Sequence, residues 1–399
     1  MTRSEVTYGQ KVAAMTPKIA NMLADERLTP DDILGLRLAN QRLTVPLSDP
    51  AEVVAHLGAV QSQDYPAARW AVGLRLRGPN LDAIEAAFAD GRILRTHVLR
   101  PTWHFVAPAD IRWMLALTGP RIRASVASYS RFLGLDESAL AASSSVIGQA
   151  LRGGKCLTRA EVGGVLREAG TAAAANGATL GHMMLHAELE GLVCSGPRRG
   201  TQHTYALLDE RAPPAPTLGR DTAVAELTWR YFNSHGPALV RDCGWWSGLT
   251  VTEINRGLEA NAGRLQSRTL DGHTYWFAAT APNPAAPPLS SAYLLPNYDE
   301  YTVAYRERDL YYDRAANAVG DPRQDVPFRH VLLVDGQVMG RWSATPRQGV
   351  MEMELRWSMA PTPGQHQAIE TAAARYATFQ GLDCRVQNAE FRTQKSADV

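Results

Sequence analysis

Two proline-rich stretches interrupt the sequence and limit what the chain can fold into. They are Arg211–Arg220 (RAPPAPTLGR) and Ala281–Leu289 (APNPAAPPL). Proline fixes φ and lacks a backbone N–H, so neither stretch can continue a helix or a central strand. We interpret both as interdomain linkers. A length of 399 residues agrees with this division, because it exceeds that of one ordinary domain.

The segment before the first linker begins with three helical patterns and a pair of strands. Helix-start signals at Pro30 and Pro50 each precede apolar residues at helical spacing, and Leu81–Phe88 shows a third such pattern. The segments Ile93–Leu99 and Thr102–Val106 are rich in β-branched and aromatic residues, which favours a hairpin. Three helices followed by a hairpin is the element order of a winged helix.

The same order of helices followed by a hairpin recurs in the residues that precede the first linker. A capping box begins a helix over Leu157–Leu166, and a second helix is expected over Thr179–Leu189. The strands Leu192–Ser195 and Thr204–Leu208 follow as a hairpin. This stretch therefore predicts a second winged-helix unit.

The segment between the two linkers repeats the pattern less distinctly. Helical patterns cover Val224–Phe232, Leu239–Trp246 and Thr252–Leu258. A hairpin then joins Arg268–Leu270 to Thr274–Phe277. We interpret this segment as a third unit of the same kind.

The last part of the chain has a different pattern. Strands are expected at Ser291–Leu295, Val331–Val334, Gln337–Trp342 and Met351–Trp357, and a helix over Gln365–Phe379 is expected to close the chain. The predicted fold is therefore α+β, with three tandem winged-helix (helix-turn-helix) domains followed by a β-rich, barrel-like C-terminal domain. The predicted domain boundaries are 1–140, 141–212, 213–285 and 286–399.

Several common protein classes are excluded by motifs that the sequence lacks. It contains no GxxxxGK[ST], no GxGxxG after a strand and no GxSxG. The four cysteines form no CxxC pattern, and His182 and His186 lack the adjacent glutamate of HExxH, so we predict neither a metal nor a cofactor. No segment supplies the roughly 20 apolar residues of a membrane span, and the N-terminus lacks the apolar core of a secretion signal. We expect a cytoplasmic protein without membrane contacts.

The distribution of charge points to nucleic acid. Basic and acidic residues nearly cancel over the whole chain, 41 against 40. The stretch Arg69–Arg131, however, contains ten arginines and four acidic residues, and such a local excess can form a basic face on a neutral protein. Five arginines are predicted to contact DNA phosphates, two of them at the tip of the second hairpin: Arg69, Arg95, Arg100, Arg198 and Arg199.

The segment AVQSQDYP, residues 59–66, contains the most informative polar residues. Pro66 biases the preceding chain towards an extended conformation, in which Gln61 and Gln63 face the same side and Ser62 faces the other. The spacing alone is also compatible with ordinary polar residues at a helix end. A role for the two glutamines therefore needs a further indication.

That indication is a family resemblance that covers most of the chain. The segment 59–66 and four others resemble the AlkZ/YcaQ-like family of DNA glycosylases, a family of winged helix DNA-binding domain-containing proteins. The other segments are LRPTWHFV (99–106), CGWWSGL (243–249), LPNYDEY (295–301) and VDGQV (334–338). The resemblance implies three winged helices and a β-rich domain around a concave DNA-binding surface. It also implies that a Gln-x-Gln motif, Gln-x-Asp in the other branch, positions the attacking water.

Gln61 and Gln63 match the Gln-x-Gln branch, which resembles glycosylases that protect producers of DNA-alkylating antibiotics. Ser62 departs from the usual aliphatic middle residue. An N7-alkylated guanine or N3-alkylated adenine already carries positive charge, so the leaving base needs no general acid. Two amide oxygens can hold a water against C1′ as the sugar becomes cationic. Because no lysine lies near the motif to form a Schiff base, we predict a monofunctional enzyme.

Other residues are assigned to the lesion pocket or to its surroundings. Ser62, Asp64, Thr102 and His104 are the candidates for the pocket. The alternative for His104 is a hydrogen-bonded core histidine, and the alternative for Asp64 is a helix cap. The acidic pair in LPNYDEY is expected to make buried hydrogen bonds, and one of the two tryptophans of CGWWSGL is expected to be buried and the other exposed.

The predicted function is hydrolysis of the N-glycosidic bond of alkylated purines in double-stranded DNA, for repair or for self-resistance to an alkylating natural product. Bulky N7-guanine adducts and interstrand crosslinks are the expected substrates, and a monomer is the expected state. The first alternative is a winged-helix transcription regulator without catalysis. The second is a catalytically inactive protein of DNA architecture. Both alternatives would bind DNA without releasing a base.

Overall fold

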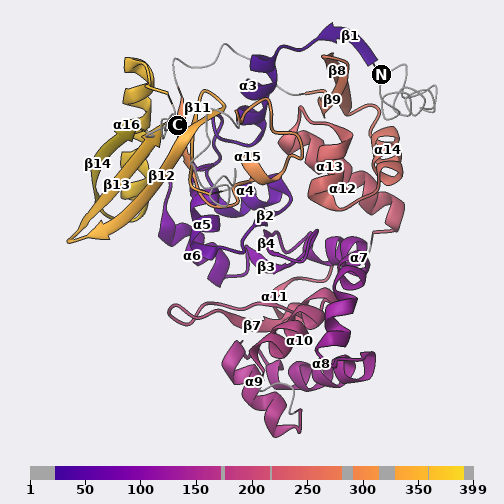
Figure 1. The fold of residues 1–399 in the computed structure, drawn as a ribbon. Coiled ribbons are helices and arrows are strands. Elements are labelled where there is room, and N and C mark those ends of the chain that lie inside the picture. The colour runs from indigo at the N-terminus through magenta and orange to yellow at the C-terminus, as the bar shows by residue number, and fades with distance from the viewer. Residues whose placement is uncertain are drawn as a thin grey trace, which may run out of the picture.

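Helices and four small sheets alternate along the chain, so the fold is α+β as predicted. A computed structural model describes residues 23–171, 176–215, 218–280, 291–313, 329–357 and 359–390. Figure 1 shows the N-terminal elements at the centre, with the second, the middle and the C-terminal parts arranged around them. The second linker, 281–289, and the N-terminal residues considered for a secretion signal lie outside the described residues.

The first unit places a three-stranded sheet, in the order β2-β4-β3, against four helices. Its elements are α3 (Pro30–Asn40), α4 (Pro50–Leu57), β2 (Val60–Gln61), α5 (Tyr65–Gly73), α6 (Leu81–Ala89), β3 (Leu94–His97) and β4 (Trp103–Val106). The predicted hairpin is confirmed by the β3–β4 pairing. Helix α5 is an addition to the three predicted helices. Pro66 lies in its first turn, where the missing N–H costs no helical hydrogen bond.

Most of the second unit packs around a core of its own, whereas the buried side chains of the first half of α7 (Ile111–Phe132) belong to the large core of the molecule. Two helices without a predicted counterpart, α7 and α8 (Glu137–Leu151), lead into β5 (Leu157–Thr158), α9 (Arg159–Glu168), α10 (Gly177–Leu189), β6 (Val193–Ser195), β7 (Thr204–Leu207) and the short α11 (Leu208–Arg211). The predicted capping box is present at the start of α9. The second core begins at Leu135 and includes α8, so a boundary at residue 140 falls inside that helix.

The third unit has the predicted helices and hairpin. Its elements are α12 (Arg220–His235), α13 (Val240–Ser247), α14 (Val251–Ala260), β8 (Leu265–Leu270) and β9 (His273–Ala278). Strand β1 (Leu23–Arg27), far away in the sequence, pairs in parallel with β8. Each of the three units thus combines helices with a small sheet, and their assignment as winged helices stays a prediction.

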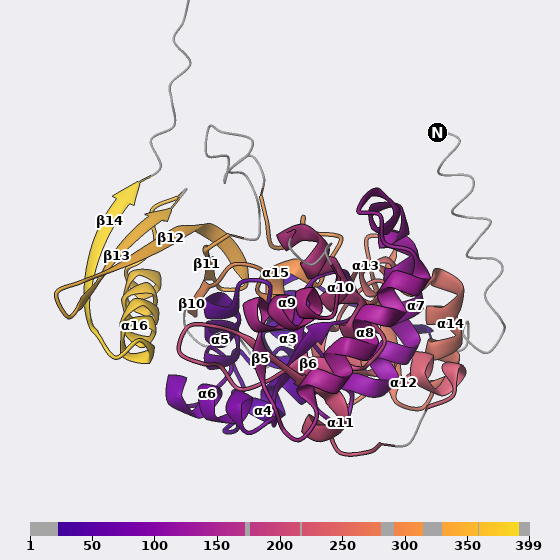
Figure 2. The ribbon, with the colours of Figure 1, turned by 90° about the horizontal axis from the view of Figure 1, so that it is seen from below.

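The C-terminal part corrects two predictions. Its five strands form an open sheet in the order β10-β11-β12-β13-β14, and no closed barrel is found in the described residues. The strands are β10 (Ala292–Leu295), β11 (Val331–Val334), β12 (Gln337–Arg347), β13 (Val350–Trp357) and β14 (Asp383–Glu390). Helix α16 (Pro363–Phe379) lies beside this sheet in Figure 2. The helix does not close the chain, because β14 follows it and pairs in parallel with β13.

One large apolar core joins the first, third and C-terminal parts, and α7 with the end of α10 contributes to it from the second unit. Trp70 in α5 donates its indole N–H to the Leu294 carbonyl, and the short helix α15 (Glu300–Val303) lies between the first and third units. Burial of apolar area is the main favourable contribution to such an arrangement. The strand that carries Gln61 is therefore held between three parts of the molecule.

Candidate active site

Gln61 ends strand β2 and lies in a row of polar side chains. It pairs directly with His104 of β4, and His104 pairs on its other side with Thr96 of β3. Directly opposed residues of antiparallel strands point to the same face of a sheet. The Gln61 side-chain oxygen is buried and accepts no hydrogen bond from a described residue. Such an unpaired acceptor is costly in an interior and marks a place where a ligand or water can bind.

Gln63 lies outside the strand and is exposed. The strand covers Val60–Gln61, the Ser62 N–H donates to the Trp103 carbonyl at 2.7 Å, and the chain bends at Gln63, so a shared side for Gln61 and Gln63 stays a prediction. The Gln63 side-chain oxygen accepts the Trp103 N–H at a long 3.5 Å. Gln63 lines a cleft of about 660 Å³ between the first and second units, with Trp103, Arg159 and His203 among the other lining residues.

The remaining pocket candidates have different positions. Asp64 also lines the cleft, but its carboxylate caps α5 at Ala67 N–H and accepts a hydrogen bond from Asn297, which confirms the capping alternative. Ser62 and His104 are fully buried, and Thr102 is half-buried. His104 Nδ1 lies 2.9 Å from the Thr102 carbonyl oxygen, as a core histidine would. Contact of these side chains with a damaged base stays a prediction.

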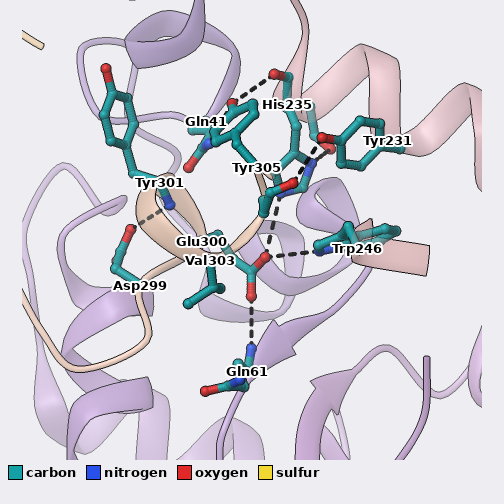
Figure 3. Close-up of polar contacts among 12 residues, drawn as sticks. Gln41, Gln61, Tyr231, His235, Trp246, Asp299, Glu300, Tyr301, Val303 and Tyr305 are labelled. Atoms are coloured by element: carbon teal, nitrogen blue, oxygen red, sulfur yellow. Dashed lines mark hydrogen bonds and ion pairs between the residues drawn. The ribbon is translucent and has the colours of Figure 1, made fainter. Parts of the chain in front are cut away.

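Behind β2 lies the carboxylate of Glu300, the first residue of α15 (Figure 3). Its two oxygens accept hydrogen bonds from the Gln61 backbone N–H at 2.8 Å and from the Trp246 indole N–H at 2.9 Å. His235 Nε2 lies 3.6 Å from one oxygen, and its ring stacks on Tyr231. The expected buried hydrogen bonds of the acidic pair are thus confirmed. Its link to Gln61 could not be predicted, because 239 positions separate the two residues.

Burial sets the charge states around Gln61. It lowers the pKa of His235, although the neighbouring Glu300 opposes that shift, and with Arg100 it lowers the pKa of His104 to about 3, so the His104 ring is neutral near pH 7. Burial alone would raise the pKa of Glu300, but His235, Arg100 and the Gln61 N–H together lower it to about 2. The described surroundings of Gln61 therefore contain the ionised carboxylate of Glu300 and the neutral ring of His104.

We expect the protein to lose stability as the pH falls below about 6.5, in part through His104. Its pKa is lower in the folded than in the unfolded chain, so between about pH 6 and 4 the unfolded state binds more protons. Proton binding stabilises the unfolded state, and the free energy of unfolding therefore falls with the pH. His104→Gln should reduce the loss by about 1.4 kcal/mol per pH unit. Urea denaturation of both proteins across this range measures the difference, and parallel curves would contradict the assigned charge state.

The five arginines predicted to contact DNA lie in three kinds of environment. Arg95 is buried, donates two hydrogen bonds to the Ser62 carbonyl and lies over the Trp103 ring, so in this structure it supports the Gln-x-Gln segment. Arg100 is largely buried next to the charge of Glu300, and its Nε and Nη2 have no hydrogen-bond partner among the described residues. Neither position favours a superficial phosphate contact.

The other three arginines lie nearer the surface and are paired. Arg69 and Arg198 both bind Glu85, which joins α5 to the loop between β6 and β7. Arg199, at the tip of that loop, pairs with Glu161 and is exposed. These pairs are accessible to water, where ion pairs are weak enough to exchange for phosphate.

Other features bear on the function classes. Trp246 is buried and Trp245 is 47% exposed, as predicted for the pair. In the part of the chain that the structure describes, no group of three His, Cys, Asp or Glu side chains could hold a metal, and no helix is long and apolar enough to cross a membrane. All four cysteines are free.

Comparisons with known proteins agree on one family. The model of the family described as "DNA glycosylase AlkZ-like" matches residues 54–379. An interstrand DNA cross-link repair glycosylase from Streptomyces sahachiroi is 24% identical over 385 residues, which covers 88% of this chain and 96% of that protein. The solved structure of the Streptomyces sahachiroi DNA glycosylase AlkZ has a TM-score of 0.74 at 20% identity and covers 91% of this chain and 100% of that one. The last comparison shows a shared fold.

Proposed function

The chain belongs to the AlkZ-like family of DNA glycosylases, and we propose that it hydrolyses the N-glycosidic bond of alkylated purines, including those joined in interstrand crosslinks. The observation that carries the proposal is the position of Gln61. Its buried side-chain oxygen has no described partner, and it lies two residues before Gln63 at the cleft. Two amides of this kind supply acceptors for a water without supplying an acid.

The chemistry of an alkylated purine fits this pair. A cationic base leaves readily, so the enzyme has to place a water and to stabilise positive charge that develops on the sugar. Amide oxygens accept the hydrogens of the water and present the negative ends of their dipoles to C1′. Nearby His104 and His203 are poor acids at neutral pH, because burial and neighbouring arginines lower their pKa values to about 3 and about 4.

The cleft supports a DNA substrate. It opens between the first and second units, next to the exposed Arg199 and the water-accessible Arg69 and Arg198. The relative from Streptomyces sahachiroi is named an interstrand DNA cross-link repair glycosylase. This name supports crosslinked guanines as one substrate of this chain. A monomer stays the expected state. The regulator alternative is not favoured, because it gives the family's glycosylase chemistry no role.

The experiment that tests the proposal uses duplex DNA with a nitrogen-mustard interstrand crosslink. We expect the wild type to separate the two strands on a denaturing gel and to leave abasic sites that alkali cleaves, whereas Gln61→Ala/Gln63→Ala should leave the crosslink intact. Failure of the wild type on the crosslink and on N7-methylguanine, with binding to undamaged DNA retained, would support the regulator alternative.

A further inference from the structure

Glu300 connects the third unit and α15 to the strand that carries Gln61. Its side chain is completely buried, and one carboxylate oxygen accepts the Gln61 N–H while the other accepts the Trp246 indole N–H. Figure 3 shows the carboxylate pointing at the backbone of Gln61. Hydrogen bonds to an ionised acceptor are about twice as strong as neutral ones. The contact is therefore a strong attachment point for β2.

We propose that Glu300 is a positioning residue: through the Gln61 backbone N–H it fixes the end of β2, and with it the amide that orients the attacking water. This inference rests on the proposed function. It adds a residue from another part of the chain to the Gln-x-Gln motif, and Glu300 acts on the reaction through Gln61 without touching the substrate.

The shortness of β2 is the reason why the attachment is needed. The strand contains Val60 and Gln61, and the chain bends immediately afterwards. A strand of this length shares few backbone hydrogen bonds with β4, among them the one from the Ser62 N–H to the Trp103 carbonyl at 2.7 Å, so further attachments restrict the motion of its end. The Glu300 carboxylate binds the last residue of the strand, and Arg95 binds the carbonyl of the next residue, Ser62.

The surroundings hold the carboxylate rigidly. Asp299 caps α15 and is joined to Arg75, two residues after the end of α5, so the helix that begins at Glu300 is attached to the first unit. On the other side, the Trp246 and His235 rings pack with centroids 5.3 Å apart. Stability alone would not require a charge here, because well-packed apolar residues often replace buried ionic groups without loss. A directed hydrogen bond to Gln61 gives the charge a function.

The test is a double-mutant cycle on the full-length protein, measured as the single-turnover rate of base release from an N7-methylguanine duplex. We expect Glu300→Gln to lower the rate about tenfold or more, as loss of a supporting contact does at other active sites, without changing duplex affinity. In the Gln61→Ala background the same substitution should change the rate less than about twofold, because the amide that Glu300 positions is gone. Glu370→Gln, on the exposed face of α16, is the matched control.

Equal losses in both backgrounds, or no loss in either, would overturn the inference, since a general structural role acts regardless of Gln61. If Glu300→Gln does not fold, Glu300→Asp replaces it in the same double-mutant cycle. Aspartate keeps the negative charge opposite Arg100, but its shorter side chain withdraws the carboxylate from the Gln61 N–H. Absence of base release by the wild type would overturn the proposed function itself, whereas an active wild type with an additive cycle would overturn only the role of Glu300.

Discussion

Replacing both Gln61 and Gln63 with alanine is expected to slow base release from an N7-methylguanine duplex by about two to three orders of magnitude. The slow spontaneous loss of this cationic base should remain. Alanine removes the two amide oxygens that would hold the water, and with them an oriented nucleophile. Single-turnover assays with quantified abasic sites measure the rate, and fluorescence anisotropy with the same duplex should give an unchanged Kd.

The single variants distinguish the two glutamines. We expect Gln61→Ala to cost more than Gln63→Ala, because Gln61 is held by Glu300 at 2.8 Å while Gln63 is exposed. Gln367→Ala, on the exposed side of α16, is the matched control and should keep the full rate. A double variant with a rate within about threefold of the wild type would contradict the water-positioning role, since a positioned group contributes far more than that.

Asp299→Asn is expected to lower the free energy of unfolding by about 3 to 5 kcal/mol. Arg75 and Asp299 have fully buried side chains and are joined by two hydrogen bonds of 2.9 and 2.8 Å. Neutralising one partner leaves a buried guanidinium without its counter-charge. Asparagine can still cap α15, so the change isolates the charge. Urea denaturation followed by the fluorescence of buried tryptophans such as Trp70 and Trp246 measures the loss.

The control for this prediction is a water-accessible ion pair. Arg92→Met removes the contact between Arg92 and Asp49, whose side chains are 45% and 42% exposed, respectively. This substitution should lower the free energy of unfolding by less than about 1 kcal/mol. A similar small cost for Asp299→Asn would mean that the buried pair does not join the segment after α5 to the start of α15 as the structure indicates.

Local signals in the sequence predicted most of the helices and hairpins. The capping box at Thr158, the start signals at Pro30 and Pro50, and the hairpin of β8 and β9 all describe interactions within a few residues of each other. Helix α5 was missed because Pro66 also favours an extended chain, and the side-chain cap from Asp64 decided between the two. Both signals lie within four residues of each other, and an aspartate followed by proline in the first turn is itself a helix-start signal.

Long-range contacts could not be predicted in the same way. The four strands expected in the C-terminal part are present but say nothing by themselves about closure, and the open sheet includes a fifth strand, β14, which follows α16 and pairs in parallel with β13. The Gln-x-Gln motif could be found in the sequence through the family resemblance. Its support by Glu300 and Arg95 could not, because both contacts depend on how distant segments pack.

The most direct test of the glycosylase is a product analysis of the wild type acting on an N7-methylguanine duplex. We predict free N7-methylguanine, identified by mass spectrometry, in equal amount to abasic strands that stay intact until alkali is added. A duplex that is bound but releases no base would contradict the proposed activity, and a strand broken before alkali would contradict simple hydrolysis.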